Sequence, residues 1–374
     1  KILASGQADM VSMARPFLAD ENFVRKAQQG RAEEINTCIA CNQACLDHGF
    51  ARKRASCLVN PRAGYETELN FPLTTHKKKL AVVGAGPAGL AFSCYAAERG
   101  HEVHLFEKSS EIGGQFNYAK RIPGKEEFFE TIRYFKKRLE VTGVHLHLDS
   151  QQSTESLADA KFDQVVLATG IKPRDVNIEG IQHPKVLNYL DVLRDNKTVG
   201  KKVAIIGAGG IGFDVAEFLV EEHSLTTQPE QWLKNWGIDK EYKHAGALTD
   251  AIIEGPAREV LLLQRKTTKV GKGLGKTTGW IHRSTLQRKQ VQMIAGVDYV
   301  KIDDQGLHIK VNDKPQILEV DNIILCAGQE PFRELQQGLE QRNIKTHLIG
   351  GADVAAELDA KRAIRQGAEW AAII

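Results

Sequence analysis

Short apolar runs alternate with longer amphipathic stretches along most of the 374 residues, as in a parallel sheet whose strands are joined by helices. In two places an apolar run leads directly into a glycine-rich turn and a helix, over residues 78–108 and 201–222. Two further apolar runs, 162–174 and 320–331, end in turns of small residues, and 346–372 has the pattern of strand, turn and helix. The chain is therefore predicted to be an α/β protein built on strand–turn–helix units.

The first 76 residues have a different pattern. The stretch "DMVSMA", residues 9–14, predicts a short strand. The stretch "ADENFVRKAQQG", residues 19–30, predicts a helix with acidic residues in its first turn, basic residues later and a closing glycine. A cysteine-rich segment and a proline-punctuated linker follow over residues 31–76, and both are predicted to be irregular.

Composition and charge argue against several classes of protein. Fifty basic and forty-seven acidic residues leave a formal net charge of +3, which is too small and too evenly spread to indicate nucleic acid or an anionic membrane as a partner. The longest uncharged run, residues 80–97, contains three glycines and a proline, and fits a strand and turn better than a membrane span. The N-terminus lacks the apolar core of a secretory signal. We therefore expect a monomeric cytoplasmic protein that binds neither nucleic acid nor membranes.

The first glycine turn, "GAGPAG", has the G-x-G-x-x-G spacing of a dinucleotide-binding turn. Gly84 allows the tight turn, Gly86 lets backbone amides approach a pyrophosphate, and Gly89 lets the helix pack closely on the strand. The N-terminus of the following helix adds partial positive charge for the anion. Glu107 ends the next strand, 107 − 84 = 23 residues after the first glycine, where an acid can bind ribose hydroxyls. This segment is therefore predicted to bind a dinucleotide.

The second glycine turn also follows an apolar strand, and its candidate binding residues are Gly207, Gly209, Gly210, Ile211 and Gly212. Its partner strand, residues 259–266, ends in Arg265 and Lys266 in place of an acid. Two basic residues at this point favour the 2′-phosphate of NADP(H) over NAD(H). The alternative is that they are two solvated charges at a strand end. Residues 223–258, between the turn and this strand, are interpreted as a polar insertion.

Four of the six cysteines fall within twenty residues, at Cys38, Cys41, Cys45 and Cys57. Clustered cysteines in a cytoplasmic protein are ligands more often than disulfides. Four thiolates suit either an iron–sulfur cluster or zinc, and the x3 and x11 spacings fit the paired C-x2-C pattern of zinc sites poorly. On spacing alone both remain open. Cys94 and Cys326 lie in apolar stretches and are predicted to be inert core thiols.

The paired dinucleotide turns, the small-residue turns and a terminal "IGGAD" resemble the flavoproteins with two dinucleotide-binding domains, the glutathione-reductase-like group. The resemblance implies two Rossmann-like domains, one binding FAD over 77–196 and 326–374, and one binding NADP(H) over 197–325. It places Glu107 at the adenosine ribose of FAD and Asp353 at the ribityl chain. The implied FAD site consists of Gly84, Gly86, Pro87, Ala88, Gly89, Glu107, Lys108, Gly114, Gln115, Thr169, Gly170 and Asp353.

The cysteine segment, with "SCLVNPRA", "GGQFN", "IPGKEEF", "GKTTGWIHR" and "ELDAKRAI", resembles the bacterial-type NADPH-dependent 2,4-dienoyl-CoA reductases over the whole chain. That resemblance implies a [4Fe–4S] cluster on the four clustered cysteines of segment 31–76. Residues 1–30 resemble the last strand and helix of a truncated TIM barrel of the old-yellow-enzyme group, in which Arg15 would contact the FMN phosphate. The family's catalytic residues lie in the part of the barrel that this sequence lacks, so no catalytic residue is expected here.

The resemblance implies an oxidoreductase, the electron-input portion of a 2,4-dienoyl-CoA reductase in unsaturated fatty acid β-oxidation. Electrons would pass from NADPH to FAD, then singly through the cluster to FMN on the barrel, where 2,4-dienoyl-CoA is reduced. The fragment alone is expected to reduce artificial dyes with NADPH. Two alternatives stay open: a related flavin and iron–sulfur amine dehydrogenase or other NADH:flavin oxidoreductase, and a zinc-bearing binding module without turnover.

Overall fold

The computed structural model describes residues 2–356 and 359–374. By the contacts within it, the chain divides into two compact units. The first comprises the chain up to Phe116, Glu127–Ile171 and Pro331–Ile374, and the second comprises Asn117–Glu126 and Lys172–Glu330. Each unit contains a parallel sheet with helices, which confirms the predicted α/β class.

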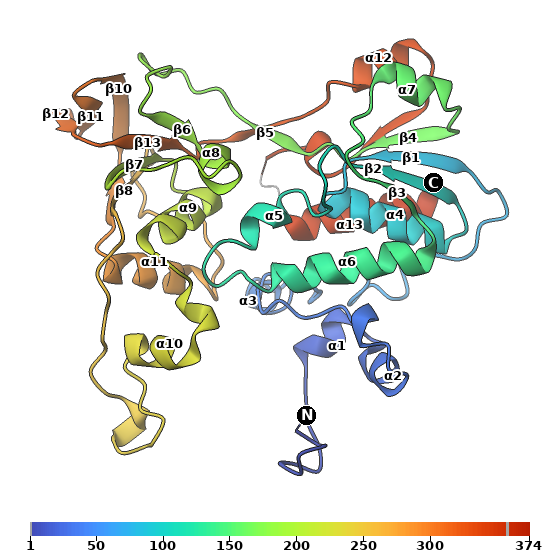
Figure 1. Ribbon diagram of the computed structural model, residues 1–374, viewed down its shortest axis with the longest axis horizontal. Coiled ribbons are helices and arrows are strands. Elements are labelled where there is room, and N and C mark those ends of the chain that lie inside the picture. Colours follow the sequence, from blue (N-terminus) through green and yellow to red (C-terminus); the bar gives the residue numbers. More distant parts are fainter. Residues whose placement is uncertain (1, 357–358) are drawn as a thin grey trace. The chain divides into compact units, whose positions relative to one another are not determined.

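A five-stranded parallel sheet forms the centre of the first unit (Figure 1). In the spatial order β15-β4-β1-β2-β3, its strands are Thr346–Leu348, Gln164–Leu167, Lys79–Val83, Glu102–Phe106 and His145–His147. The helices that pack on one face are α4, α6 and α13, at Pro87–Glu98, Phe128–Thr142 and Ala360–Ile373. The shorter helices on the other face are α7 and α12, at Thr154–Asp159 and Gln336–Gln341. Helix α5, Phe116–Ala119, lies at the border of the unit.

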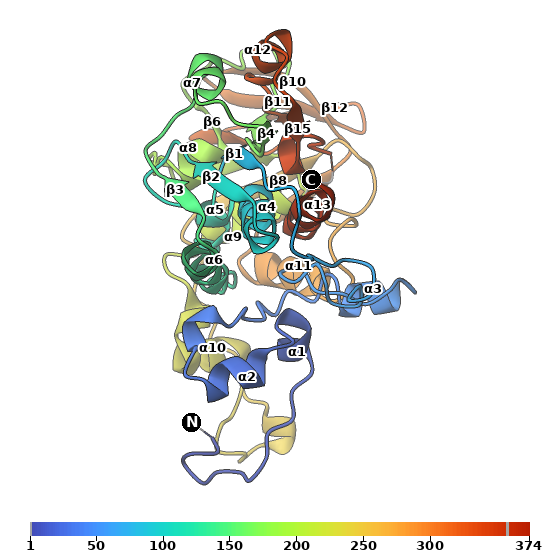
Figure 2. The same cartoon turned by 90° about the vertical axis from the view of Figure 1, so that its right-hand side faces the viewer.

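The strands of this sheet are buried on both faces. Along β1, Leu80 and Val82 enter the core beneath α4, whereas Ala81 and Val83 enter the core beneath α7 and α12. This two-sided burial explains why the strands read as continuous apolar runs. Helices α4 and α13 lie side by side (Figure 2), and a Cβ added to Gly367 of α13 would overlap the backbone of α4.

The second unit contains another five-stranded parallel sheet and a three-stranded antiparallel sheet. In the spatial order β6-β13-β7-β8-β9, the parallel strands are Val186–Asn188, Asn322–Leu325, Lys202–Ile206, Glu259–Gln264 and Gln292–Ala295. The antiparallel strands β10, β11 and β12 are Val297–Asp303, Gly306–Val311 and Lys314–Leu318. They cover one face of the parallel sheet, and helices α9 and α11 cover the other. The helices α8, α9, α10 and α11 are Tyr189–Leu193, Gly210–Val220, Pro229–Trp236 and Gly279–Arg288. Strands β5 and β14, Ile171–Pro173 and Gln329–Pro331, pair separately.

The N-terminal segment of the first unit is made of short helices joined by irregular chain. Its helices α1, α2 and α3 are Arg15–Ala19, Phe23–Gln28 and Leu46–Phe50. The predicted helix over 19–30 is therefore confirmed in its centre. The predicted strand over 9–14 is wrong, because these residues are irregular in the described chain. A parallel barrel strand needs neighbouring strands to accept and donate its backbone hydrogen bonds, and none of the described strands pairs with these residues.

The borders between the units differ from those expected for the two binding domains. Residues 172–196, expected with the FAD domain, lie in the second unit, because β6 pairs with β13 there. Residues 117–126 also belong to the second unit. Among the described helices, none combines the length and apolar character needed to cross a membrane.

Candidate functional site

The first glycine turn joins β1 to α4, as the sequence predicts. Gly84 has a φ of +107°, and a Cβ there would lie 2.5 Å from the carbonyl oxygen of Ala168, so a side chain is excluded. A Cβ on Gly89 would overlap the carbonyl oxygen of Gly84. By contrast, a Cβ on Gly86, the N-cap of α4, would meet nothing within 4 Å. The turn therefore combines tight packing with open space at the helix N-terminus, the arrangement that binds a pyrophosphate.

Glu107 follows β2 and braces the first glycine turn. Its side chain is buried, and one carboxylate oxygen accepts a hydrogen bond from the Ala85 N–H at 2.8 Å. The other oxygen accepts from the N–H and the hydroxyl of Ser109, at 3.0 and 2.7 Å. The oxygen that bonds to Ala85 keeps a lone pair that can accept a ribose hydroxyl. The sequence predicts an acid at this position, but it does not predict the hydrogen bond between its carboxylate and the Ala85 N–H of the turn.

Two other turns pack against the first glycine turn. A Cβ on Gly114 would lie 2.9 Å from the Cα of Gly86, so the predicted "GGQF" segment closes onto it. A Cβ on Gly350 would lie 2.7 Å from the Cβ of Ala88, which places the turn before Asp353 against the start of α4. Segments far apart in the sequence thus meet around one helix N-terminus.

The remaining predicted FAD residues lie in the same unit. The Thr169 hydroxyl donates to the Phe332 carbonyl at 2.5 Å, and Gly170 has a φ of +78°. Gln115 is half-buried. Lys108 is exposed, with its ammonium 5.8 Å from the centroid of the Phe332 ring. Asp353 is half-buried, and its carboxylate accepts from the Gln366 side-chain amide at 2.6 Å.

The second glycine turn repeats the design between β7 and α9. Gly207 has a φ of +109°, and a Cβ on Gly212 would overlap the carbonyl oxygen of Gly207. Gly209, the N-cap of α9, again leaves open space at the helix N-terminus, and Gly210 and Ile211 form the first turn of this helix. Arg265 and Lys266 follow the end of β8 directly, and both side chains are exposed.

The four clustered cysteines line one small pocket in the first unit. They share its wall with apolar side chains that include Leu18, Ile39 and Leu58. All four are half-buried free thiols. Within their loop Ala40 and Asn42 have φ values of 53° and 59°, in the left-handed region, and these turns curl the chain around the pocket. The Ser56 N–H donates to the Ala44 carbonyl at 2.8 Å and so ties the last cysteine's segment to the loop.

Arg15 borders the same pocket. Its guanidinium donates to the Asn42 side-chain oxygen at 2.7 Å. The structure thus places this arginine against the cysteine loop, and its contact with an FMN phosphate stays a prediction.

Burial lowers the acidity of two of the clustered thiols, Cys41 and Cys57. It raises the pKa of the Cys41 thiol to about 12 and also raises the pKa of Cys57. Backbone N–H groups oppose the shift, because that of Gln43 donates to the Cys41 sulfur and those of Val59 and Asn60 donate to Cys57. A lone thiolate is therefore disfavoured at neutral pH, whereas a thiolate bound to a cation would gain these hydrogen bonds. The pocket fits a metal or iron–sulfur group.

The other two cysteines are fully enclosed. Cys94 lies on α4 and Cys326 follows β13, and both are buried. Burial raises the pKa of the Cys94 thiol to about 12 and raises that of Cys326 further. Their prediction as core thiols is confirmed.

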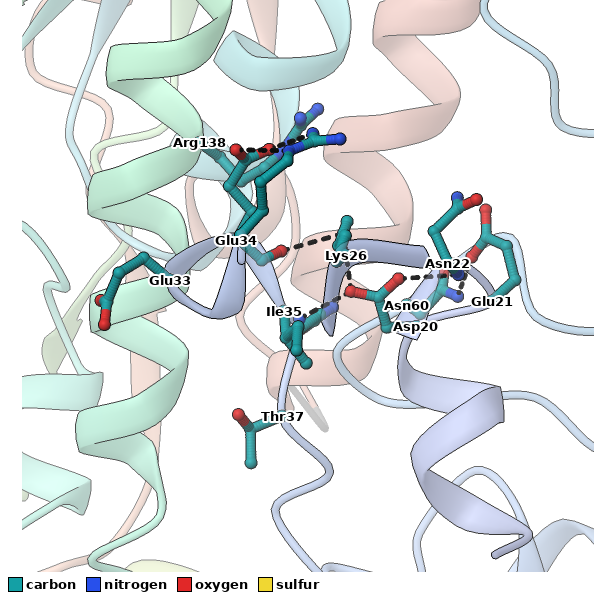
Figure 3. Close-up of polar contacts among 12 residues, drawn as sticks. Asp20, Glu21, Asn22, Lys26, Glu33, Glu34, Ile35, Thr37, Asn60 and Arg138 are labelled. Carbon is teal, nitrogen blue, oxygen red and sulfur yellow. Dashed lines mark hydrogen bonds and ion pairs between the residues drawn. The ribbon is translucent and has the colours of Figure 1, made fainter. Parts of the chain in front are cut away.

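A buried carboxylate, that of Asp20, makes several polar contacts with residues close to the cysteine segments; Figure 3 shows Asp20 beside Lys26 and Asn22. Asp20 is 3% exposed and accepts hydrogen bonds from the Lys26 ammonium at 2.6 Å and the Asn22 N–H at 3.0 Å. It also accepts from the Asn36 N–H at 2.8 Å, while the Asn36 side-chain amide donates to the Val59 carbonyl at 2.9 Å. Asn36 lies two residues before the first clustered cysteine, and Val59 lies two residues after the last one. Asp20 and Asn36 are therefore positioning residues, which the sequence did not reveal.

Replacing Asp20 with asparagine is expected to lower the free energy of unfolding by about 1–3 kcal/mol. The amide oxygen is a weaker acceptor for the Lys26 ammonium, and the amide NH₂ group replaces a carboxylate oxygen that accepted a hydrogen bond. Urea unfolding monitored by circular dichroism measures this. The matched control is Asp298→Asn, since Asp298 is exposed on β10. Equal stability of the two variants would show that the Asp20 contacts do not hold the segment.

Two glycine turns, each at a strand–helix junction of a parallel sheet, define a protein with two dinucleotide-binding domains. The sequence profile of the pyridine nucleotide-disulphide oxidoreductases matches residues 78–360. The chain belongs to this family and is a flavin-dependent oxidoreductase.

Similar proteins include reductases as well as dehydrogenases of amines. The chain is 34% identical over 355 residues to the "Metal reductase" of Desulforamulus reducens, covering 94% of this chain and 52% of that protein. It is 28% identical over 356 residues to the "Cinnamate reductase" of Clostridium sporogenes, covering 94% and 48%. A solved structure of 2-naphthoyl-CoA reductase with 2-naphthoyl-CoA superposes with a TM-score of 0.85 at 29% identity, covering 100% of this chain and 52% of that one. The chain thus spans about half the length of the curated relatives it matches.

Proposed function

We propose that this chain is the electron-input portion of an NADPH-dependent reductase of conjugated acyl-CoA esters, with 2,4-dienoyl-CoA as substrate of the whole protein. The single observation that carries the proposal is the pocket lined by four thiols in the same unit as the first glycine turn. The relatives that reduce cinnamate and 2-naphthoyl-CoA support a conjugated double bond as the final electron acceptor.

The spacing of the sulfur atoms supports an iron–sulfur cluster over zinc. In the part of the chain that the structure describes, no three of the four sulfurs lie all within 4.8 Å of one another. Four thiolates about 2.3 Å from one zinc ion would lie about 3.8 Å apart in a tetrahedron. A [4Fe–4S] cluster binds each thiolate through a different iron and so spreads the sulfurs more widely.

The chain's own residues supply binding and orientation. A bound FAD would supply acceptance of a hydride from NADPH, and a bound cluster would supply transfer of single electrons. The N-termini of α4 and α9 present backbone N–H groups to the two pyrophosphates. Glu107 orients the adenosine ribose, Asp353 the ribityl chain, and Arg265 with Lys266 the 2′-phosphate. The half-buried cysteine pocket limits the access of water to the thiolates.

Replacing both Arg265 and Lys266 with serine is expected to raise the KM for NADPH roughly 10- to 100-fold, since charge-assisted hydrogen bonds contribute about 1.5–3 kcal/mol. The KM for NADH should stay unchanged, because NADH lacks the 2′-phosphate. Steady-state dye reduction with each coenzyme measures this. Lys314→Ser, at an exposed position of β12, is the matched control. An equal change for both coenzymes would refute a 2′-phosphate site.

The decisive experiment uses the purified chain under anaerobic conditions with FAD supplied. NADPH should bleach the flavin absorbance and support dye reduction, without turnover of 2,4-dienoyl-CoA. Metal analysis should find iron and labile sulfide. Zinc held by the clustered cysteines, with no iron, would favour the binding module, and a bound flavin that NADPH does not reduce would favour the amine dehydrogenase. Dienoyl-CoA turnover by this chain alone would contradict the proposal.

A further inference from the structure

Three histidines and a glutamate gather at the edge of the sheet in the first unit. Glu102 and His104 are two residues apart on β2, and His145 and His147 are two apart on the edge strand β3. The strands are parallel, with His104 opposite His145. Because residues i and i+2 of a strand project from the same face, all four side chains emerge together. That face is opposite to the one on which Val103 and Leu105 enter the core beneath α4 and α6.

The distances are those of a cation-binding group. The Nε2 atom of His104 lies 2.9 Å from a carboxylate oxygen of Glu102. The centroid of the His104 ring lies 4.6 Å from the centroid of the His145 ring. One ligand atom from each of these three residues lies within 4.8 Å of the other two. Imidazole and carboxylate groups together suit zinc and neighbouring divalent transition metals. We propose that Glu102, His104 and His145 form a binding site for a divalent transition-metal ion such as Zn²⁺, with His147 orienting His104.

The second nitrogen of His104 has the partner that such a ligand requires. Its Nδ1 atom lies 3.1 Å from Nε2 of His147. Since the Glu102 carboxylate only accepts, a neutral His104 ring donates to it from Nε2–H and therefore accepts at Nδ1 from Nε2–H of His147. A metal at Nε2 replaces that proton, and His104 then donates from Nδ1–H to His147. Both rings change tautomer and no net proton leaves. Histidine ligands are commonly oriented in this way by a partner on the other ring nitrogen.

The site is open to ions in solution. Glu102 and His145 are exposed and His104 is half-buried, so three protein ligands leave coordination positions for water. The ion would join β2 to β3, an edge strand of only three residues. It would therefore fasten the edge of the sheet. Its ligand Glu102 begins β2, whereas the glycine turn lies beside the end of β2, where the Gly84 N–H donates to the Phe106 carbonyl. Its role is to stabilise this edge.

The test is Zn²⁺ binding by equilibrium dialysis of the purified chain and its variants. His104→Ala and His145→Ala should each bind one Zn²⁺ fewer per chain, and His147→Ala should bind that ion roughly 10- to 100-fold more weakly. Zinc taken up by the cysteines contributes equally to every variant and cancels in the difference. His183→Ala is the matched control, because His183 pairs with Asp304 at 3.1 Å on another surface.

A thermal measurement gives an independent readout. Zn²⁺ should raise the melting temperature of the wild-type and His183→Ala chains more than that of the His145→Ala chain. Because His145 is exposed, its replacement should not disturb folding, and a smaller increase would reflect the lost ligand. Zn²⁺ stoichiometry unchanged in both His104→Ala and His145→Ala would overturn the proposal, whatever the outcome for the cysteine pocket.

Discussion

Replacing Cys41 with alanine is expected to remove iron and labile sulfide from the purified chain while FAD stays bound. Cys41 lines the four-thiol pocket, and its sulfur accepts a hydrogen bond from the Gln43 N–H. With three of the four thiols left, the site would hold a cluster less firmly, and its affinity for iron should fall roughly tenfold or more. Among the residues that the structure describes, those of the glycine turn proposed to bind FAD do not line the pocket of this thiol. Iron, sulfide and flavin analyses on the same sample measure the three quantities.

The control for this change is Cys94→Ala, which removes a buried thiol from α4. It should cost about 1 kcal/mol in stability through the small cavity it leaves, and leave the iron content unchanged. Retention of iron in Cys41→Ala, or equal loss from both variants, would show that the clustered cysteines do not hold a cluster.

Replacing Gly86 with alanine is expected to weaken FAD binding about 100-fold, or about 3 kcal/mol, without destabilising the flavin-free chain. A Cβ there meets nothing within 4 Å, and its φ of −80° suits any residue. The folded chain should therefore tolerate the methyl group. The pyrophosphate should not, because it must approach the backbone at this point. Flavin titration by fluorescence and urea unfolding of the flavin-free chain separate the two effects.

Two further glycine variants serve as comparisons for Gly86→Ala. Gly89→Ala should destabilise the flavin-free chain itself, because its Cβ would overlap the Gly84 carbonyl oxygen. Gly255→Ala, at an open position in the second unit, should change neither stability nor flavin binding. If Gly86→Ala bound FAD as tightly as the wild type, the open space at the start of α4 would not be the pyrophosphate site.

Local patterns predicted the parts of the structure that depend on local chemistry. Both glycine turns lie where the spacing places them, because the chain must turn sharply between a buried strand and a helix. The apolar runs after 162 and 320 became β4 and β13, since strands buried on both faces need continuous apolar side chains. Arg265 and Lys266, predicted to end the strand over 259–266, directly follow β8, which ends at Gln264.

Contacts between distant segments could not be read from such patterns. Asp20 has no motif around it, yet it connects α2 to the segment that precedes the cysteines. Arg133, on α6, donates to the carbonyls of Glu33 and Ile35 at 2.6 and 2.8 Å, about 100 residues away in sequence. The apolar pattern over 9–14 suggested a strand, but strand formation depends on a pairing partner that the pattern does not contain.

The packing of α13 on α4 has a consequence for biosynthesis. The helix that begins at the first glycine turn is made early in translation, whereas β15 and α13, which complete its sheet and cover its flank, follow 346 − 87 = 259 or more residues later. The main segment of the second unit, Lys172–Glu330, is complete before β15 is made, so this unit can fold first. Flavin should therefore be incorporated only after α13 has been made, and a shortened chain that ends just before β15 should bind NADPH but not FAD.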